Sequence, residues 1–211
     1  MAEVSGQGLH FSYETTGDGF PLVLAPGPQG VWSPYIPLLG ELCRTIMYTG
    51  HDLVGVPSDE GLHPSACAAQ MLGTFLDLLS LERVYLASQT VSWHMALHFA
   101  LHCPGRLEGL VLIGAHDMAT DAIYGIMSLE AHLHAITIPT LVVSEAEAFA
   151  ALPYADFLTE RLPRCTKLVI SAAPPAAVSS IPAVRLGHAV MRFLLHCERQ
   201  RNLVRGASFL L

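Results

Sequence analysis

The sequence predicts an α/β protein with a mostly parallel central sheet and helices on both of its faces. Short apolar runs typical of strands alternate with longer segments whose apolar residues recur at helical spacing, which is the pattern of β-α-β units. Hydrophobic residues make up 52% of the 211 residues and charged residues only 14%, which favours strands buried on both faces. No internal repeat or linker interrupts the pattern, so we expect a single domain, 1–211.

The first half of the chain is predicted to contain three strands and one long helix. The first two strands, Leu9–Glu14 and Pro21–Ala25, are separated by the turn Gly17–Gly19, and the third covers Arg44–Thr49. The helix is predicted from apolar residues whose spacing places them on one helical face: Ala68, Met71, Leu72, Phe75 and Leu79.

The second half repeats the alternation. A strand at Val84–Ala87 leads into a helix from about Val91 to Cys103, which Pro104 and Gly105 end. Three more strands are predicted at Gly109–Ile113, Thr140–Ser144 and Lys167–Ser171. The last helix is indicated by apolar residues on one face: Leu186, Val190, Phe193, Leu194 and Cys197.

Composition and charge exclude several classes of partner. The net charge is −7 and basic residues do not cluster, so no nucleic-acid partner is expected. The five cysteines are widely spaced and form no C-x-x-C pair, and the eleven histidines are scattered, so we expect reduced thiols, no metal site and no cofactor. The first eight residues lack the features of a signal peptide, and no apolar run reaches membrane-spanning length. A cytoplasmic protein without a membrane partner is therefore expected.

Several motifs follow one another along the chain in a characteristic order. The segment Ser88-Gln89-Thr90-Val91-Ser92 stands between a predicted strand and a predicted helix. Four further motifs flank it, and they are Pro21–Gly27, Asp52–Ser58, Cys103–Gly114 and Ile138–Val143. In this order they resemble the α/β-hydrolase superfamily over essentially the whole chain. Only a short segment separates the strand at 110–115 from the strand at 140–144, and the resemblance therefore implies an α/β-hydrolase fold with no cap domain.

The resemblance also shows where the family's catalytic residues would stand. In α/β-hydrolases a serine at the centre of G-x-S-x-G is the nucleophile, and this place is held here by Thr90. The acid position corresponds to Glu147, and the base position corresponds to Pro175, which cannot accept a proton. The two oxyanion donors would come from Val91 and from Pro28, but proline has no backbone N–H. We therefore predict a degenerate triad and no serine-hydrolase activity.

The leading interpretation is a hydrolase-like protein with a binding or structural role. An open apolar cleft is expected to hold a small hydrophobic ligand or a partner's side chain. The residues assigned to it are Gly27, Pro28, Thr90, Val91, Trp93, His116 and Asp117.

Two alternatives reuse the same cleft for catalysis. One is a cofactor-independent lyase, isomerase or cyclase that takes its acid and base from Asp117, from His51 with Asp52, and from His94. The other is a weak esterase that uses Thr90.

The low content of charged residues also predicts self-association as a two-fold dimer. The contributors we expect are an edge strand, the terminal helix around Leu186–Cys197 and the apolar end Phe209–Leu211.

Overall fold

An eight-stranded sheet in the order β1-β2-β4-β3-β5-β6-β7-β8 forms the centre of the protein. The computed structural model describes residues 1–27, 30–51, 64–89, 92–114, 129–146, 152–171 and 183–208. The antiparallel part joins β1 (Ala2–Gly6) to β2 (Leu9–Thr16) and β2 to β4 (Cys43–His51). All pairings from β4 onward are parallel, and they include β3 (Phe20–Leu24), β5 (Val84–Gln89), β6 (Leu107–Gly114), β7 (Thr140–Glu145) and β8 (Cys165–Ile170).

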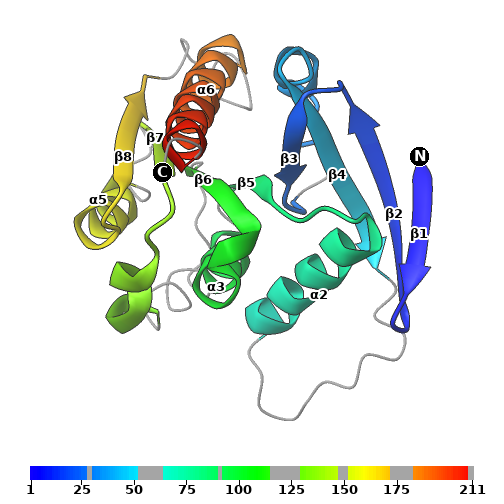
Figure 1. The fold of residues 1–211 in the computed structure, drawn as a ribbon. Helices are drawn as coiled ribbons and strands as arrows, with labels where there is room; N and C mark the ends of the chain where they lie inside the picture. The colour runs from blue at the N-terminus through cyan, green and yellow to red at the C-terminus, as the bar shows by residue number, and fades with distance from the viewer. Residues whose placement is uncertain are drawn as a thin grey trace.

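Helices cover both faces of this sheet (Figure 1). One face is covered by α1 (Ile36–Leu39) and α6 (Ala183–Ser208). The other face carries α2 (Pro64–Leu78), α3 (Trp93–His102) and α5 (Leu152–Arg161), together with the 3₁₀ helix η3 (Glu130–Ala135). A second 3₁₀ helix, η2 (Pro104–Arg106), follows α3. Two separate hydrophobic cores result, one on each face, because alternate residues of each strand point to opposite sides.

The expectation of a mostly parallel sheet with helices on both faces is confirmed. Each of the seven predicted strands is present, with boundaries within two residues of the expected ones. Within the described ranges, the elements that were not predicted are β1, α1, α5 and the 3₁₀ helix η2. The tail from Gln200 was not assigned to the last helix, but α6 continues through Ser208.

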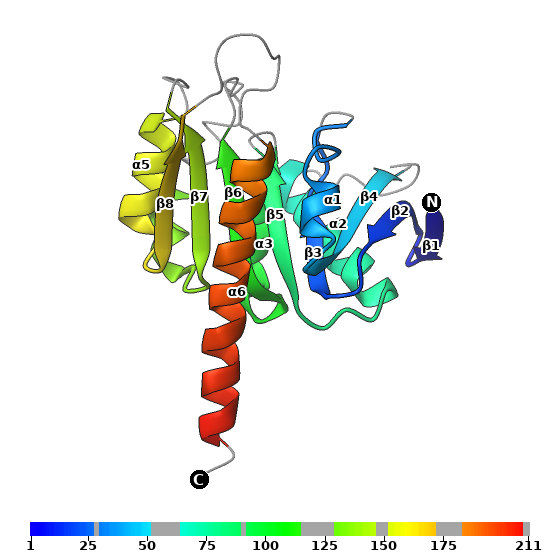
Figure 2. The same ribbon diagram turned by 90° about the horizontal axis from the view of Figure 1, so that it is seen from above.

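Helix α6 lies along the sheet and continues beyond its lower edge (Figure 2). The predicted apolar face is confirmed, since Leu186, Val190, Leu194 and Cys197 are buried against the sheet. This face packs on the chain's own strands, and Val184 and Leu195 of the same helix are exposed, so a contribution of this helix to a dimer stays a prediction.

A chain of polar contacts ties the far end of α6 to the strands. The Tyr85 hydroxyl on β5 donates to Oε1 of Glu198 at 2.7 Å. Arg201 pairs with Glu198 and, at 3.5 Å, with Glu108 of β6, which also pairs with Arg83 at 3.2 Å. Burial and the contact with Glu198 raise the pKa of Tyr85, so the phenol remains a neutral donor.

The five cysteines are free thiols. Burial raises the pKa of Cys43 to about 12 and that of Cys197 to about 11, so both remain protonated at neutral pH. Among the described residues, no helix combines the length and the apolar character that crossing a membrane requires.

Candidate active site

Four parallel strands bring the candidate catalytic segments to one edge of the sheet. Strands β5, β6, β7 and β8 end at Gln89, Gly114, Glu145 and Ile170. Their register places these ends next to one another: Gln89 opposite Ile113, Gly114 opposite Ser144, and Glu145 opposite Ile170. Ligands of open α/β sheets bind at this carboxyl edge.

Two buried serines flank position 90. Strand β5 ends at Gln89 and α3 begins at Trp93, so the chain passes from strand to helix here. The Ser88 hydroxyl donates to Oγ of Ser92 at 3.0 Å, and the Ser92 hydroxyl donates to the backbone oxygen of Gln89 at 3.1 Å. The Ser88 hydroxyl also lies 3.3 Å from the Gln89 oxygen, so both buried hydroxyls have acceptors within this turn.

The loop after β3 is tied to the same turn. The backbone N–H of Ala25 donates to the oxygen of Ala87 at 2.8 Å, and the Trp32 indole donates to the oxygen of Ala25 at 2.8 Å. From the turn side, the Gln89 side-chain amide donates to the oxygen of Val31 at 3.4 Å. The two segments that the sequence analysis linked are thus neighbours in the structure.

A cavity of about 250 Å³ lies between these segments and the start of α2. We call it the elbow cavity. Its lining is mainly apolar and includes Pro26, Tyr48, Ala68, Met71, Ser92 and Met95. Tyr48 and Ser92 add hydroxyls to this wall, and burial raises the pKa of Tyr48, so its phenol stays neutral. The cavity can accept a small apolar molecule that carries one or two hydrogen-bonding groups.

Trp93 occupies a different place from the one expected. The sequence analysis put it in the cleft wall, but its side chain is completely buried and belongs to the core under α3. A Cβ on Gly114 would lie 3.1 Å from Cη2 of the Trp93 ring, so the ring fills the space that this glycine leaves. Its neighbours Ser92 and Met95 line the elbow cavity instead.

Two buried polar atoms near the ends of β6 and β7 lack a hydrogen-bond partner within the described part of the chain. They are Nε1 of Trp93 and Oγ of Ser144. Ser144 lies opposite Gly114, the glycine on which the Trp93 ring packs. Buried polar groups are normally hydrogen-bonded, so each of these atoms is a place where a bound polar atom would be stabilised.

The histidines of α3 form a row that leads away from the turn. His94 is 4% exposed, its ring centre lies 4.7 Å from that of His98, and the His98 ring lies 5.6 Å from that of His102. No group of three His, Cys, Asp or Glu side chains among the described residues could hold a metal ion.

The fold is shared with known hydrolases of several kinds. No family model matches the chain. The curated 2-hydroxy-6-oxo-2,4-heptadienoate hydrolase of Pseudomonas putida is 30% identical over 132 residues, which are 56% of this chain and 48% of that hydrolase. The match therefore covers about half the length of this relative.

Two solved structures extend the likeness to nearly the whole chain. The enol-lactonase from Burkholderia xenovorans LB400 matches with a TM-score of 0.71 and 13% identity over 92% of this chain and 100% of that one. The carboxylesterase CesB from Bacillus subtilis matches with a TM-score of 0.70 and 16% identity over 92% and 90% of the two chains.

The chain has the α/β-hydrolase fold. The resemblance seen in the sequence is therefore confirmed at the level of the fold, and the segment that resembles the nucleophile elbow lies where β5 ends and α3 begins. Several of the predicted site residues lie outside the described residues. These are Pro28, Thr90, Val91, His116, Asp117, Glu147 and Pro175.

Sequence reasoning missed six residues that line the elbow cavity: Tyr48, Pro64, Ser65, Ala68, Met71 and Met95. The sequence analysis assigned Met71 to the buried face of a helix. Met71 is 6% exposed, so it belongs to the core as predicted and also lines the cavity. These side chains form a cavity wall because of how α2 and α3 are placed relative to each other, and the sequence does not show this placement.

Proposed function

We propose that this protein binds a small, largely apolar carbonyl compound in the elbow cavity and does not hydrolyse it through a serine triad. The observation that carries the proposal is the cavity itself, because it lies between the loop after β3 and the turn after β5. An apolar enclosure with a few hydroxyls binds apolar ligands and orients them.

The absence of triad chemistry is proposed from the residues at the family positions. Thr90 replaces the nucleophile, Pro175 replaces the base, and Pro28 removes one oxyanion donor. Neither flanking serine is a replacement nucleophile, because the Ser92 hydroxyl donates to the Gln89 oxygen and the Ser88 hydroxyl donates to Ser92. Loss of one oxyanion donor alone typically costs about 3 kcal/mol of transition-state stabilisation.

The ligand class is proposed from the names of similar proteins together with the cavity wall. The name of the matched hydrolase gives a seven-carbon oxo-dienoate as its substrate. The names of the matched lactonase and esterase give an enol-lactone and carboxylic esters. Each carries a carbonyl group next to a carbon chain or ring, and the neutral hydroxyl of Tyr48 in the cavity wall suits a carbonyl oxygen.

Binding is tested with a cavity-filling variant. Short-chain ketones and esters are titrated against the protein by calorimetry, with the variant Ala68→Leu, whose longer side chain enters the cavity. The matched control is Ala66→Leu on the same helix, since Ala66 does not line the cavity. We expect Ala68→Leu to weaken binding about tenfold or more and Ala66→Leu to leave it unchanged; equal affinities of the two variants would disprove the site.

Catalysis is tested separately with a fluorophosphonate probe and activated esters. We expect no labelling and ester turnover at the background rate. Stoichiometric labelling that Thr90→Ala abolishes would instead establish a threonine-dependent esterase. The non-hydrolytic alternative receives no support from His94, which is buried and packs on His98 rather than lining the elbow cavity.

A further inference from the structure

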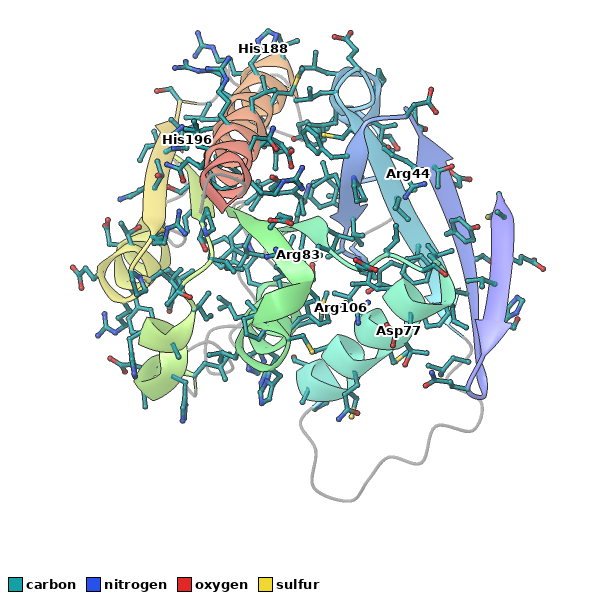
Figure 3. The ribbon with its side chains drawn as sticks, viewed as in Figure 1. Arg44, Asp77, Arg83, Arg106, His188 and His196 are labelled. Atoms are coloured by element: carbon teal, nitrogen blue, oxygen red, sulfur yellow. The ribbon has the colours of Figure 1, made fainter. Side chains whose placement is uncertain are left out.

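The outer face of α6 carries positive charge without any negative charge. Its exposed residues from Val184 to Leu203 include Arg185, Arg192 and Arg199, and none of the exposed residues in this range is acidic. His188 and His196 lie on the same outer side, as Figure 3 shows. We call these five residues the basic face. The net charge of the whole chain is −7, so this face is a local exception.

The three arginines of the basic face have no carboxylate partner among the residues that the structure describes. Other arginines do: Arg83, Arg106, Arg161 and Arg201 each form an ion pair. The acidic residue of α6, Glu198, points to the sheet and is already bound by Tyr85 and Arg201. The guanidinium groups of the basic face are therefore free to pair with carboxylates from elsewhere.

The arginines of the basic face are evenly spaced along α6. Arg185, Arg192 and Arg199 follow one another at seven-residue intervals, which places their Cα atoms about 10.5 Å apart along the helix axis and nearly on one line. Leu195 stands between the last two and is 37% exposed. An exposed apolar side chain thus lies between Arg192 and Arg199 on the outer face.

A groove runs beside this line, between α6 and β8. Its volume is about 670 Å³, and both Arg192 and Arg199 border it, together with Leu168, Phe193 and Leu195. Arginine side chains over an apolar floor are suited to a segment that is both acidic and apolar.

We propose that the basic face docks an acidic amphipathic helix of a partner protein, with Glu or Asp at seven-residue intervals against Arg192 and Arg199 and Leu-type residues between them in the groove. This interaction is independent of the elbow cavity, because α6 lies on the opposite face of the sheet from α2 and α3. A second copy presenting the same face would bring arginines against arginines, which disfavours a symmetric α6–α6 contact.

The test uses a fluorescein-labelled, alanine-based helical peptide with Glu at every seventh position and Leu three residues after each Glu. A matched peptide has Gln in place of Glu. Binding is measured by anisotropy with the wild-type protein, Arg192→Gln/Arg199→Gln, Leu195→Ser, and the control Arg161→Gln on α5. Urea unfolding of each variant verifies that it folds, as expected for Arg192, Leu195 and Arg199, which are exposed.

We expect the Glu peptide to bind and to weaken with rising salt, because exposed ion pairs are screened. The double arginine variant should weaken binding by about tenfold, Leu195→Ser by less, and Arg161→Gln not at all. The proposal fails if the Glu peptide does not bind, if the Gln peptide binds equally well, or if the double variant binds normally. It also fails if vesicles containing phosphatidylglycerol or a single-stranded oligodeoxynucleotide bind as tightly as the peptide.

Discussion

Ser88 and Ser92 stand where the G-x-S-x-G motif that this segment resembles has glycines, and both serines are buried. A glycine leaves room at such a turn, whereas a serine fills the room with a hydroxyl that must be satisfied when buried. Here one hydroxyl satisfies the other at 3.0 Å, and the second then reaches the Gln89 oxygen. A serine at position 88 and a serine at position 92 therefore suit each other, because each hydroxyl has a hydrogen-bond partner within the turn.

The serine pair is tested with a double-mutant cycle. Ser88→Ala and Ser92→Ala should each cost about 1 kcal/mol of unfolding free energy, because each removes one hydroxyl of the pair while the remaining hydroxyl keeps the Gln89 backbone oxygen as an acceptor. The double variant should cost less than the sum of the two, which urea unfolding measures. Strict additivity would show that the two hydroxyls do not act together.

Gly114 has a packing role at the edge of the candidate site. A Cβ there would lie 3.1 and 3.2 Å from two atoms of the buried Trp93 ring. We expect Gly114→Ala to destabilise the protein by about 1–3 kcal/mol, since the rigid ring cannot move away in a packed core.

Gly105 provides the control for this substitution, because a Cβ there meets nothing within 4 Å. Gly105→Ala should leave the midpoint of urea unfolding almost unchanged. If both alanine variants behave alike, Trp93 does not constrain position 114.

The same contact explains why Trp93 was misassigned from the sequence. It follows the candidate nucleophile closely in sequence, and nearness in sequence suggested nearness to the cleft. The side-chain direction depends on where α3 begins and on the missing side chain at Gly114, and neither is visible in a linear motif.

At the scale of elements, α6 depends on a small number of polar contacts for the attachment of its far end. Glu198 accepts the hydroxyl of Tyr85 and pairs with Arg201. Glu198→Ala should therefore destabilise the protein by about 1–3 kcal/mol, because the buried Tyr85 hydroxyl loses its acceptor.

A matched change on α5 tests whether this loss is specific. Glu160 pairs with Arg161 at 3.4 Å at an exposed position, so Glu160→Ala should change the unfolding free energy by less than about 0.5 kcal/mol. Equal effects of the two variants, measured by urea unfolding, would show that Glu198 contributes as a surface charge only.

The predicted elements were those with a strong apolar pattern. Val84–Gln89 is buried throughout, and the buried residues of α6 recur at helical spacing, so both were visible in the sequence. β1 is mainly exposed and polar, and it is a strand only because β2 pairs with it. α6 continues past the sheet (Figure 2), and Leu203 in that part is 74% exposed, so a core-facing apolar pattern did not indicate it.

At the scale of the whole molecule, part of the apolar excess is explained by the two cores. The large hydrophobic side chains exposed among the described residues are few, namely Met1, Val169, Val184, Leu195 and Leu203. Val169 belongs to β8, the last strand of the sheet order, whose outer edge has no pairing strand among the described residues.

Self-association therefore stays a prediction, with the β8 edge as its expected contact. An unpaired edge with an exposed valine can add a strand from a second copy. Light scattering at micromolar concentration should give twice 22.7 kDa, and Val169→Lys should shift it to the monomer. A monomer for the unchanged protein would show that the apolar excess is entirely core.

The strand order has a consequence for how the protein folds. β2 and β3 are consecutive in the chain, yet β4 lies between them, so they cannot pair as a simple hairpin. β1 and β2 join the parallel strands only through β4, and they can detach while the remaining ladder stays paired. Amide protons of β1 should therefore exchange with solvent through a local opening well before those of β5, whose release requires the whole sheet to unfold.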